Sequence, residues 1–349
     1  VGTIKLLGYF SMEYKDLACL GYTHFQPAQP TTVGKRAAMW AENFVIDYHQ
    51  ISDLYKDRKL RGLKGATGTQ ASFLELADGD EAKVVALNKL FLEKLGYDDD
   101  FCVTGQTYPR KYDSIVLQAL AGIGESAHKF GFDFRILQHK KEIEEPFEEK
   151  QIGSSAMAYK RNPMRLERMC SLARDAMINE MKPRITSSIQ LFERTLDDSA
   201  ARRDYVPQSF LDIDEVLNLA MNVMKNPTVY PKMIKRNLNA ELPFMATENI
   251  LMAVVKRGKD RQEMHEVIRQ HSQEAARRVK QEGKDNNLLE MLAGDERIGM
   301  SLDKINAAID VRNFIGRAPS QVVEYYEREI KPILDIEGDA LNIRSDVQV

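Results

Sequence analysis

Residues 112–134 read YDSIVLQALAGIGESAHKFGFDF, and this stretch decides the fold class. Apolar side chains recur along it at steps of three and four residues, a spacing that places them on one face of an α-helix. That face carries Tyr112, Ile115, Val116, Ala119, Leu120, Ile123, Ala127, Phe130 and Phe134. The length of this helix, about seven turns of roughly 3.6 residues each, predicts a bundle of long helices rather than a small α/β unit.

The same periodicity extends to both sides of this helix. The first eighteen residues look like the end of a helix, and further helices are predicted over roughly 33–58, 80–95, 164–192 and 209–225. No stretch of the sequence shows the alternation expected of a half-buried β-strand. The predicted class is therefore all-α, a long-helix bundle with a small C-terminal helical domain.

Two prolines, Pro227 and Pro231, interrupt the helical pattern after the last long helix, and the helices predicted beyond them are shorter. One of these covers 261–282, where Asp260 and Glu263 resemble a capping box. We therefore expect two domains. The central long-helix bundle over 1–229 would carry the functional loops, and 230–349 would form the small C-terminal domain.

The overall composition narrows the class of protein. Of the 349 residues, 43% are hydrophobic and 29% are charged, as is typical of globular proteins. A formal net charge of -3 gives no general attraction to nucleic acid or to an anionic membrane, so neither is expected as a partner. The three cysteines are far apart and form no CxxC pattern, which suits a reducing compartment and predicts a cytoplasmic location.

Three polar loops interrupt the helical pattern. The first contains Thr23-His24-Phe25-Gln26 and the prolines that follow it, the second covers 97–109 with Gln106, and the third leads into the helix predicted from Met164. Long helices can bring such loops together at one end of a bundle, where they would form a site. His24 is the best candidate for proton transfer near neutral pH.

The third loop reads GSSAMAYKRNP over residues 153–163. Gly153 and the small side chains after it leave backbone amides free to approach an anion, and Lys160 adds a positive charge. The alternative is an ordinary Gly/Ser connection with a solvated Lys-Arg pair. From the residues alone, either Lys160 or His24 could be the base.

Two charged segments flank this loop. Residues 140–150, KKEIEEPFEEK, are interpreted as a solvated face. Residues 194–203, RTLDDSAARR, could bind a phosphate or form a surface cluster of ion pairs.

The sequence holds no HExxH, Walker or dinucleotide-binding pattern, so no metal and no cofactor are expected. A base, an acid and a loop that binds an anion, without a cofactor, suit an elimination or addition reaction next to a carboxylate.

At this point the residues resemble a known family. GSSAMAYKRNP is similar to the signature loop of the fumarase/aspartase superfamily, GSSxMPxKxNP, with Ala158 in place of a proline that carries no functional group. Within the superfamily, YTHFQPAQ at 22–29 and YKRN at 159–162 most resemble the adenylosuccinate lyases of the animal type. The similarity covers nearly all of the chain and is weaker past Pro332.

The resemblance implies a cofactor-free β-elimination that releases fumarate. Members of this family split adenylosuccinate into AMP and fumarate, and split the succinyl-carboxamide ribotide of purine synthesis in the same way. Carried over by position, Ser154 would be the general base, which requires the loop amides and Lys160 to lower its pKa. His24 would be the general acid that protonates the departing nitrogen, and Glu167 would orient its ring.

The resemblance also implies the residues that bind this nucleotide substrate. Lys160 and Asn162 would stabilise the developing carboxylate dianion. Thr23 and Gln106 would contact the succinyl part of the substrate, and Arg168 would contact its other anionic groups. The phosphate would be bound by Arg194, Ser199 and Arg203. Family members are homotetramers in which each active site takes loops from three subunits.

Two alternatives stay open at this point. A sister lyase, such as argininosuccinate lyase, would share Ser154 and His24 but would not need Arg194 and Arg203, and a non-catalytic helical homologue would keep only the scaffold. The chain opens with Val1 in helix-like periodicity. Because family members carry an N-terminal domain with a second active-site histidine and phosphate-binding residues, we expect such a part to precede it.

Overall fold

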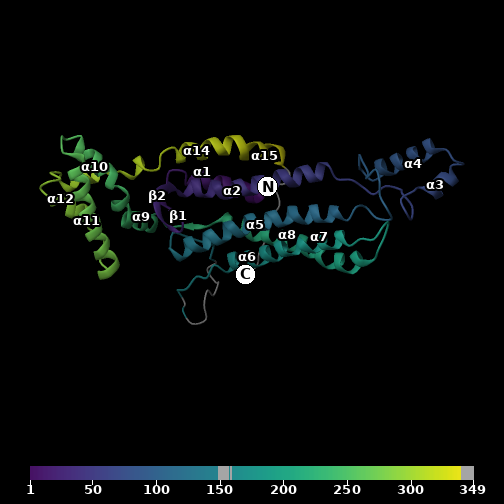
Figure 1. The fold of residues 1–349 in the computed structure, drawn as a ribbon, viewed down its shortest axis with the longest axis horizontal. Coiled ribbons are helices and arrows are strands. Elements are labelled where there is room, and N and C mark those ends of the chain that lie inside the picture. Colours follow the sequence, from purple (N-terminus) through teal and green to yellow (C-terminus); the bar gives the residue numbers. More distant parts are fainter. Residues whose placement is uncertain (148–156, 158, 339–349) are drawn as a thin grey trace.

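The computed structural model describes residues 1–147, 157 and 159–338, and it shows an elongated bundle of long helices (Figure 1). The predicted all-α class is confirmed. The bundle is built from α1 (Gly2–Glu13), α2 (Val33–Lys56), α5 (Lys111–His139), α6 (Met164–Asn179), α7 (Met181–Ser188) and α8 (Asp197–Lys225). No helix among the described residues is both long and apolar enough to cross a bilayer.

Helix α5 lies at the centre of the bundle. Its predicted apolar face is buried in the second half of the helix, but Ile115 in the first half is 44% exposed, so that part of the prediction was wrong. On one side, Trp40 of α2 packs edge-on against Phe130, with ring centroids 5.4 Å apart, and its indole N–H donates to Asp133 at 2.9 Å. On the other side, a Cβ at Gly124 would come within 3.0 Å of the Ala173 carbonyl oxygen of α6. The glycine thus permits the close approach of these two helices.

Residues predicted as the first loop form a β-hairpin instead. Strands β1 (Ala18–Thr23) and β2 (Gln26–Thr32) pair antiparallel, with an irregularity between Cys19 and Gly21. The loop prediction was wrong because prolines exclude a helix but are tolerated in an edge strand, and β2 pairs with β1 alone in the described chain. A second pair of short strands joins β3 (Ile143–Glu144) to β4 (Thr228–Val229).

Two predicted helix boundaries are also wrong. The helix expected over 164–192 is divided at Glu180 into α6 and α7, and the helix expected from Ser209 begins at Asp197 and continues through Pro207. Acidic residues in the first turn, Asp197 and Asp198, favour this early start because they face the positive end of the helix dipole. Arg202 and Arg203 therefore lie on a helix and not in a loop.

Smaller helices extend from both ends of the bundle in Figure 1. At one end lie α3 (Ala71–Leu76), which was not predicted, and α4 (Glu81–Lys94). At the other end lie α9 (Pro231–Met245), α10 (Thr247–Val255), α11 (Arg261–Glu282), α12 (Leu288–Ala293) and α13 (Leu302–Ala308), followed by a 3₁₀ turn at Val311–Asn313. The prediction for α11 is confirmed, and Asp260 accepts a hydrogen bond from the Glu263 N–H at 2.9 Å.

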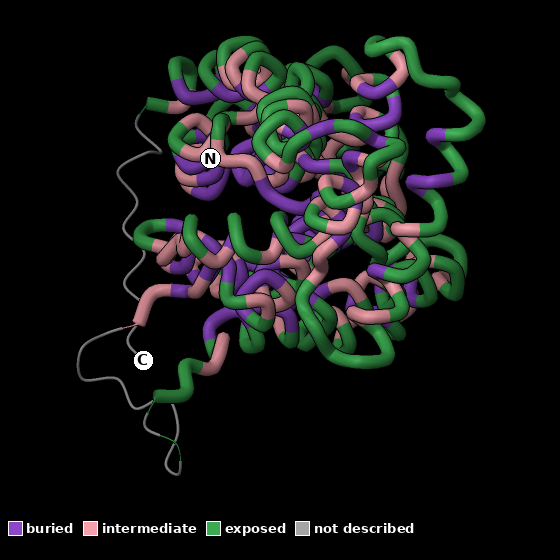
Figure 2. Tube along the Cα trace, turned by 90° about the vertical axis from the view of Figure 1, so that its left-hand side faces the viewer, coloured by how far each residue is buried: buried purple, intermediate pink, exposed green. Residues whose placement is uncertain are grey.

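The chain then returns to the bundle. Helix α14 (Ala318–Tyr325), a π-helical turn (Tyr326–Ile330) and α15 (Lys331–Ile336) run alongside α1 and α2 (Figure 1). In the end view of Figure 2, the buried residues lie on the inward sides of the helices. They form one cluster within the bundle, which includes Ile330, Ile333 and Leu334, and a second between Ala246 and Ile309. The domain boundary at 229/230 stays a prediction, and packing places α14 and α15 with the bundle.

Candidate active site

His24 lies at the tip of the β-hairpin, in a strained turn. His24 and Phe25 are its two central residues, with φ of 51° and 60°, and both side chains are exposed. Positive φ at both positions is the requirement of a type I′ turn, for which Asn-Gly is usual, and non-glycine residues held in this region are typical of functional sites. The ring of Tyr22 lies 4.8 Å from the Lys140 ammonium, which places the hairpin at the C-terminal end of α5.

The signature segment reaches the described structure only in its second half. Ser154 lies outside the described residues. Lys160 is exposed and its backbone N–H donates to the Met157 carbonyl at 2.9 Å, whereas Asn162 is half-buried. Glu167 and Arg168 follow, exposed, in α6. Within the described chain the Glu167 carboxylate lies 3.5 Å from the Arg135 guanidinium and is not paired with His24.

The charged run before this segment is not uniformly solvated, so that prediction was wrong for residues 140–147; residues 148–150 lie outside the described part of the chain. Glu142 and Glu145 are only 1% and 3% exposed. The two carboxylate oxygens of Glu145 accept the backbone N–H groups of Arg165 and Leu166, each at 3.1 Å. These are orphan donors at the start of α6, which has no cap of its own. Burial raises the pKa of Glu145 although these N–H groups oppose the shift.

Further contacts fix the residues just before α6 to the end of α5. The Gln138 side chain donates to the Arg161 carbonyl at 3.1 Å, and the Arg161 guanidinium lies 3.3 Å from the Glu144 carboxylate. The Tyr230 hydroxyl donates to the same carboxylate at 2.8 Å. Lys160 and Asn162, on either side of Arg161, therefore lie at the C-terminal end of α5, as His24 does.

Replacing Glu145 by Ala is expected to lower the free energy of unfolding by about 2–4 kcal/mol, because two buried N–H groups of α6 lose their acceptor. Urea unfolding followed by circular dichroism measures this loss. The matched control is Glu290→Ala, which removes an exposed helical carboxylate and should change the stability by less than about 0.5 kcal/mol. Equal effects of the two substitutions would contradict the capping role.

Gln106 lies at the opposite end of α5. Its backbone N–H donates to the Glu193 carbonyl at 3.0 Å, and a Cβ at Gly105 would lie 2.5 Å from that oxygen. Only glycine permits so close an approach. The loop that carries Gln106 therefore packs directly on the residue before Arg194.

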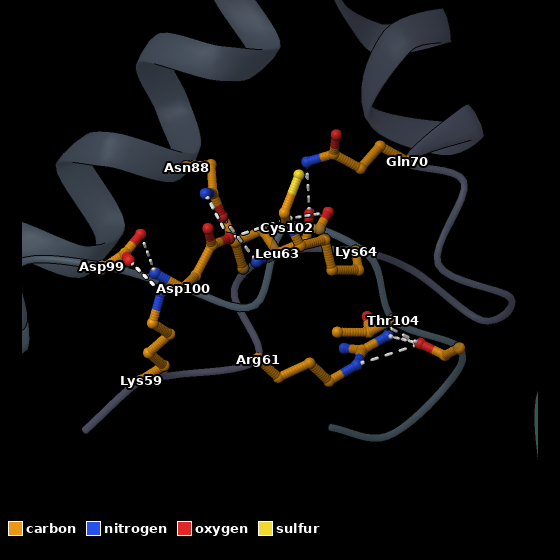
Figure 3. A network of polar contacts seen from close by, with 11 residues as sticks. Lys59, Arg61, Leu63, Lys64, Gln70, Asn88, Asp99, Asp100, Cys102 and Thr104 are labelled. Atoms are coloured by element: carbon orange, nitrogen blue, oxygen red, sulfur yellow. Dashed lines mark hydrogen bonds and ion pairs between the residues drawn. The ribbon is translucent and has the colours of Figure 1, made fainter. Parts of the chain in front are cut away.

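A polar network supports this loop from the side of α4 (Figure 3). The Lys64 ammonium lies 2.8 Å from the Asp100 carboxylate, which also accepts from the Asn88 amide at 2.9 Å. The Arg61 guanidinium donates to the Gly105 carbonyl at 3.2 Å. The Gly/Thr-rich loop at 61–71 thus holds the Gln106 loop, a role that its sequence did not predict.

The predicted phosphate-binding residues lie beside Gln106. The Nη1 atom of Arg194 donates to both oxygens of Asp198, at 3.0 and 3.1 Å. Ser199 and Arg203 lie four residues apart on α8, so they share one face of that helix. Arg203 is exposed and Ser199 half-buried. The cluster combines the Arg194–Asp198 ion pair with the exposed guanidinium of Arg203. It is therefore compatible both with a surface cluster of ion pairs and with phosphate binding, the two interpretations of this segment.

The predicted site residues therefore fall into two groups. The α5-C-terminal group comprises Thr23, His24, Lys160, Asn162, Glu167 and Arg168, and the α5-N-terminal group comprises Gln106, Arg194, Ser199 and Arg203. Helix α5 has 29 residues, which at about 1.5 Å per residue separates its ends by about 43 Å. The expectation that the polar loops meet at one end of the bundle is wrong within a single chain.

Comparisons with known proteins agree with this architecture. A family described as "Lyase" matches residues 4–177, and one described as "Adenylosuccinate lyase C-terminus" matches 243–325. The 3-carboxy-cis,cis-muconate lactonizing enzyme from Pseudomonas putida superposes with a TM-score of 0.79 at 20% identity, covering 93% of this chain and 70% of that one. That likeness concerns the fold alone. Fold and family matches together define the helical lyases of the fumarase/aspartase superfamily.

Two curated relatives narrow the assignment. The adenylosuccinate lyases of Schizosaccharomyces pombe and Saccharomyces cerevisiae are each 49% identical over 334 residues, which cover 96% of this chain and 69% of each relative. The chain belongs to the adenylosuccinate lyase family. The match spans the hairpin, the second half of the signature segment and both groups of predicted site residues.

Proposed function

We propose that this protein splits adenylosuccinate into AMP and fumarate, and that it acts in the same way on the succinyl-carboxamide ribotide of purine synthesis. The observation that carries the proposal is the identity of 49% to curated adenylosuccinate lyases over 96% of the chain. The arginines of the α5-N-terminal group support a phosphate-bearing substrate, because a guanidinium binds phosphate oxygens through two parallel hydrogen bonds.

The residues divide the elimination between them. Ser154 removes a proton from the carbon β to the nitrogen, the electron pair left behind forms the carbon–carbon double bond of fumarate, and the C–N bond breaks. His24 gives a proton to the departing nitrogen, so the AMP amine leaves uncharged. Lys160 and Asn162 stabilise the carboxylate dianion that develops as the proton leaves.

The separation of the two groups supports an assembly in which copies share active sites. A substrate of nucleotide size cannot reach both ends of α5, so a complete site would draw the α5-N-terminal group from a different copy than the α5-C-terminal group. We propose the homotetramer that the family resemblance implies. We also propose a cytoplasmic location, in keeping with the free cysteines Cys19, Cys102 and Cys170.

Fumarate release tests the function directly. The full-length protein should release fumarate from adenylosuccinate and not from argininosuccinate. The ultraviolet absorbance of fumarate measures this release. Argininosuccinate lacks the phosphate that Arg194 and Arg203 are proposed to bind. Turnover of argininosuccinate alone would favour the sister lyase, and turnover of neither would favour the non-catalytic homologue.

A further inference from the structure

Asp198 lies between two arginines at the start of α8. Its side chain is fully buried; it accepts two hydrogen bonds from Arg194 Nη1, and its Oδ2 atom lies 2.6 Å from Arg110 Nε. Burial alone would raise the pKa of Asp198, but Arg194 and Arg110 outweigh it and leave the pKa below its ordinary value. The carboxylate is therefore ionised, with a guanidinium on either side.

Arg194 is held on one side only. Its side chain is 23% exposed, compared with 9% for Arg110. Within the described chain, the Nη2 and Nε atoms of Arg194 have no hydrogen-bond acceptor. A guanidinium that is fixed through one nitrogen and open at the others loses less rotamer freedom when it binds an anion.

We propose that Asp198 is a positioning residue that holds Arg194 in the orientation that binds the substrate's phosphate. The inference rests on the proposed function, in which Arg194 contacts that group. Arg110 fixes Asp198 from the other side, and its guanidinium lies over the Tyr108 ring at 4.6 Å. The chain Arg110–Asp198–Arg194 thus anchors the phosphate-binding arginine to the start of α5.

The same two helices provide a matched control. The Asp113 carboxylate of α5 lies 2.6 Å from the Arg202 guanidinium and accepts a hydrogen bond from the Tyr108 hydroxyl, also at 2.6 Å. Its side chain is 8% exposed, so it is buried like Asp198. Asp113 pairs with Arg202, which is not a predicted phosphate ligand, and in the described part of the chain no hydrogen bond or ion pair joins it to Arg194.

Calorimetric titration of the full-length protein with AMP, inorganic phosphate and adenosine tests the role. In Asp198→Asn the affinity for AMP should fall about 10- to 100-fold, the value of one charge-assisted hydrogen bond, while adenosine binding stays within about twofold. The KM for adenylosuccinate should rise more than kcat falls. Asp113→Asn should leave AMP affinity within about twofold, because it removes no hydrogen bond or ion pair of Asp198 or Arg194.

A double-mutant cycle separates positioning from general destabilisation. In an Arg194→Gln background, Asp198→Asn should cause no further loss of AMP affinity, because Asp198 acts through Arg194. Additive losses, or equal losses in Asp113→Asn, would overturn the proposal. If circular dichroism shows that Asp198→Asn does not fold, Asp198→Glu keeps the charge but displaces Arg194, and unchanged AMP affinity in that variant would also overturn it.

The failure of this inference is distinguishable from that of the proposed function. Suppose that AMP affinity depends on Asp198 through Arg194 but the protein releases no fumarate from adenylosuccinate. The lyase activity is then refuted and the positioning role stands. If the protein releases fumarate but its AMP affinity does not depend on Asp198, the positioning role is refuted and the lyase activity stands.

Discussion

Ser154→Ala is expected to reduce kcat for adenylosuccinate by about 10²- to 10⁴-fold, the contribution of a positioned general base. The expectation rests on the signature segment GSSAMAYKRNP, in which the resemblance assigns the base to the first serine. The substitution removes one hydroxyl and no bulk, so the KM should change little. Steady-state fumarate release measures both constants.

The neighbouring hydroxyl is the control for this substitution. Ser155→Ala removes the same atom one residue further along the segment. It should retain kcat within about tenfold, because a hydroxyl that only binds contributes about one hydrogen bond. If Ser155→Ala lost as much activity as Ser154→Ala, or if Ser154→Ala kept full turnover, the assignment of the base would be wrong. Lys160 would then be the next candidate.

The all-α class could be predicted because apolar residues recur with helical spacing over long stretches of the sequence. The buried face in the second half of α5 and the boundaries of α11 follow from apolar spacing and from the Asp260 cap, whereas Ile115, on the first half of the predicted face, is 44% exposed. The hairpin at 18–32 could not be predicted, since prolines and a register irregularity hide the alternation on which strand prediction depends. Its unusual turn at His24 and Phe25 is a property of the backbone and leaves no trace in the sequence pattern.

The burial of charge was equally hidden. In KKEIEEPFEEK the glutamates look alike, and only the fold shows that Glu142 accepts from the Asn237 amide and Glu145 caps α6. The chemistry of the loops could be predicted from the types of residue that they contain.

The distribution of the loops over the two ends of α5 could not be predicted. A local sequence pattern contains no information on the direction in which successive long helices run.

A mixture of two inactive variants is expected to recover activity, because His24 and Gln106 lie at opposite ends of α5. His24→Gln removes the acid from the α5-C-terminal group, and Gln106→Ala removes the proposed succinyl contact from the α5-N-terminal group. When the full-length variants are denatured together and refolded at equal concentration, about a quarter of the shared sites should receive both groups intact, since each site draws its two groups from different copies at random. Fumarate release relative to the refolded unmodified protein measures this fraction.

The control uses two substitutions that no assembly can separate. Thr23→Val and His24→Gln affect neighbouring residues at one hairpin tip, so every copy in their mixture carries a damaged tip and no activity should return. Recovery in the His24/Gln106 mixture but not in the Thr23/His24 mixture requires that one site combine two chains. If neither mixture recovers activity while each variant still assembles like the unmodified protein, the α5-C-terminal and α5-N-terminal groups do not meet in a shared site. The two groups would then have to act separately.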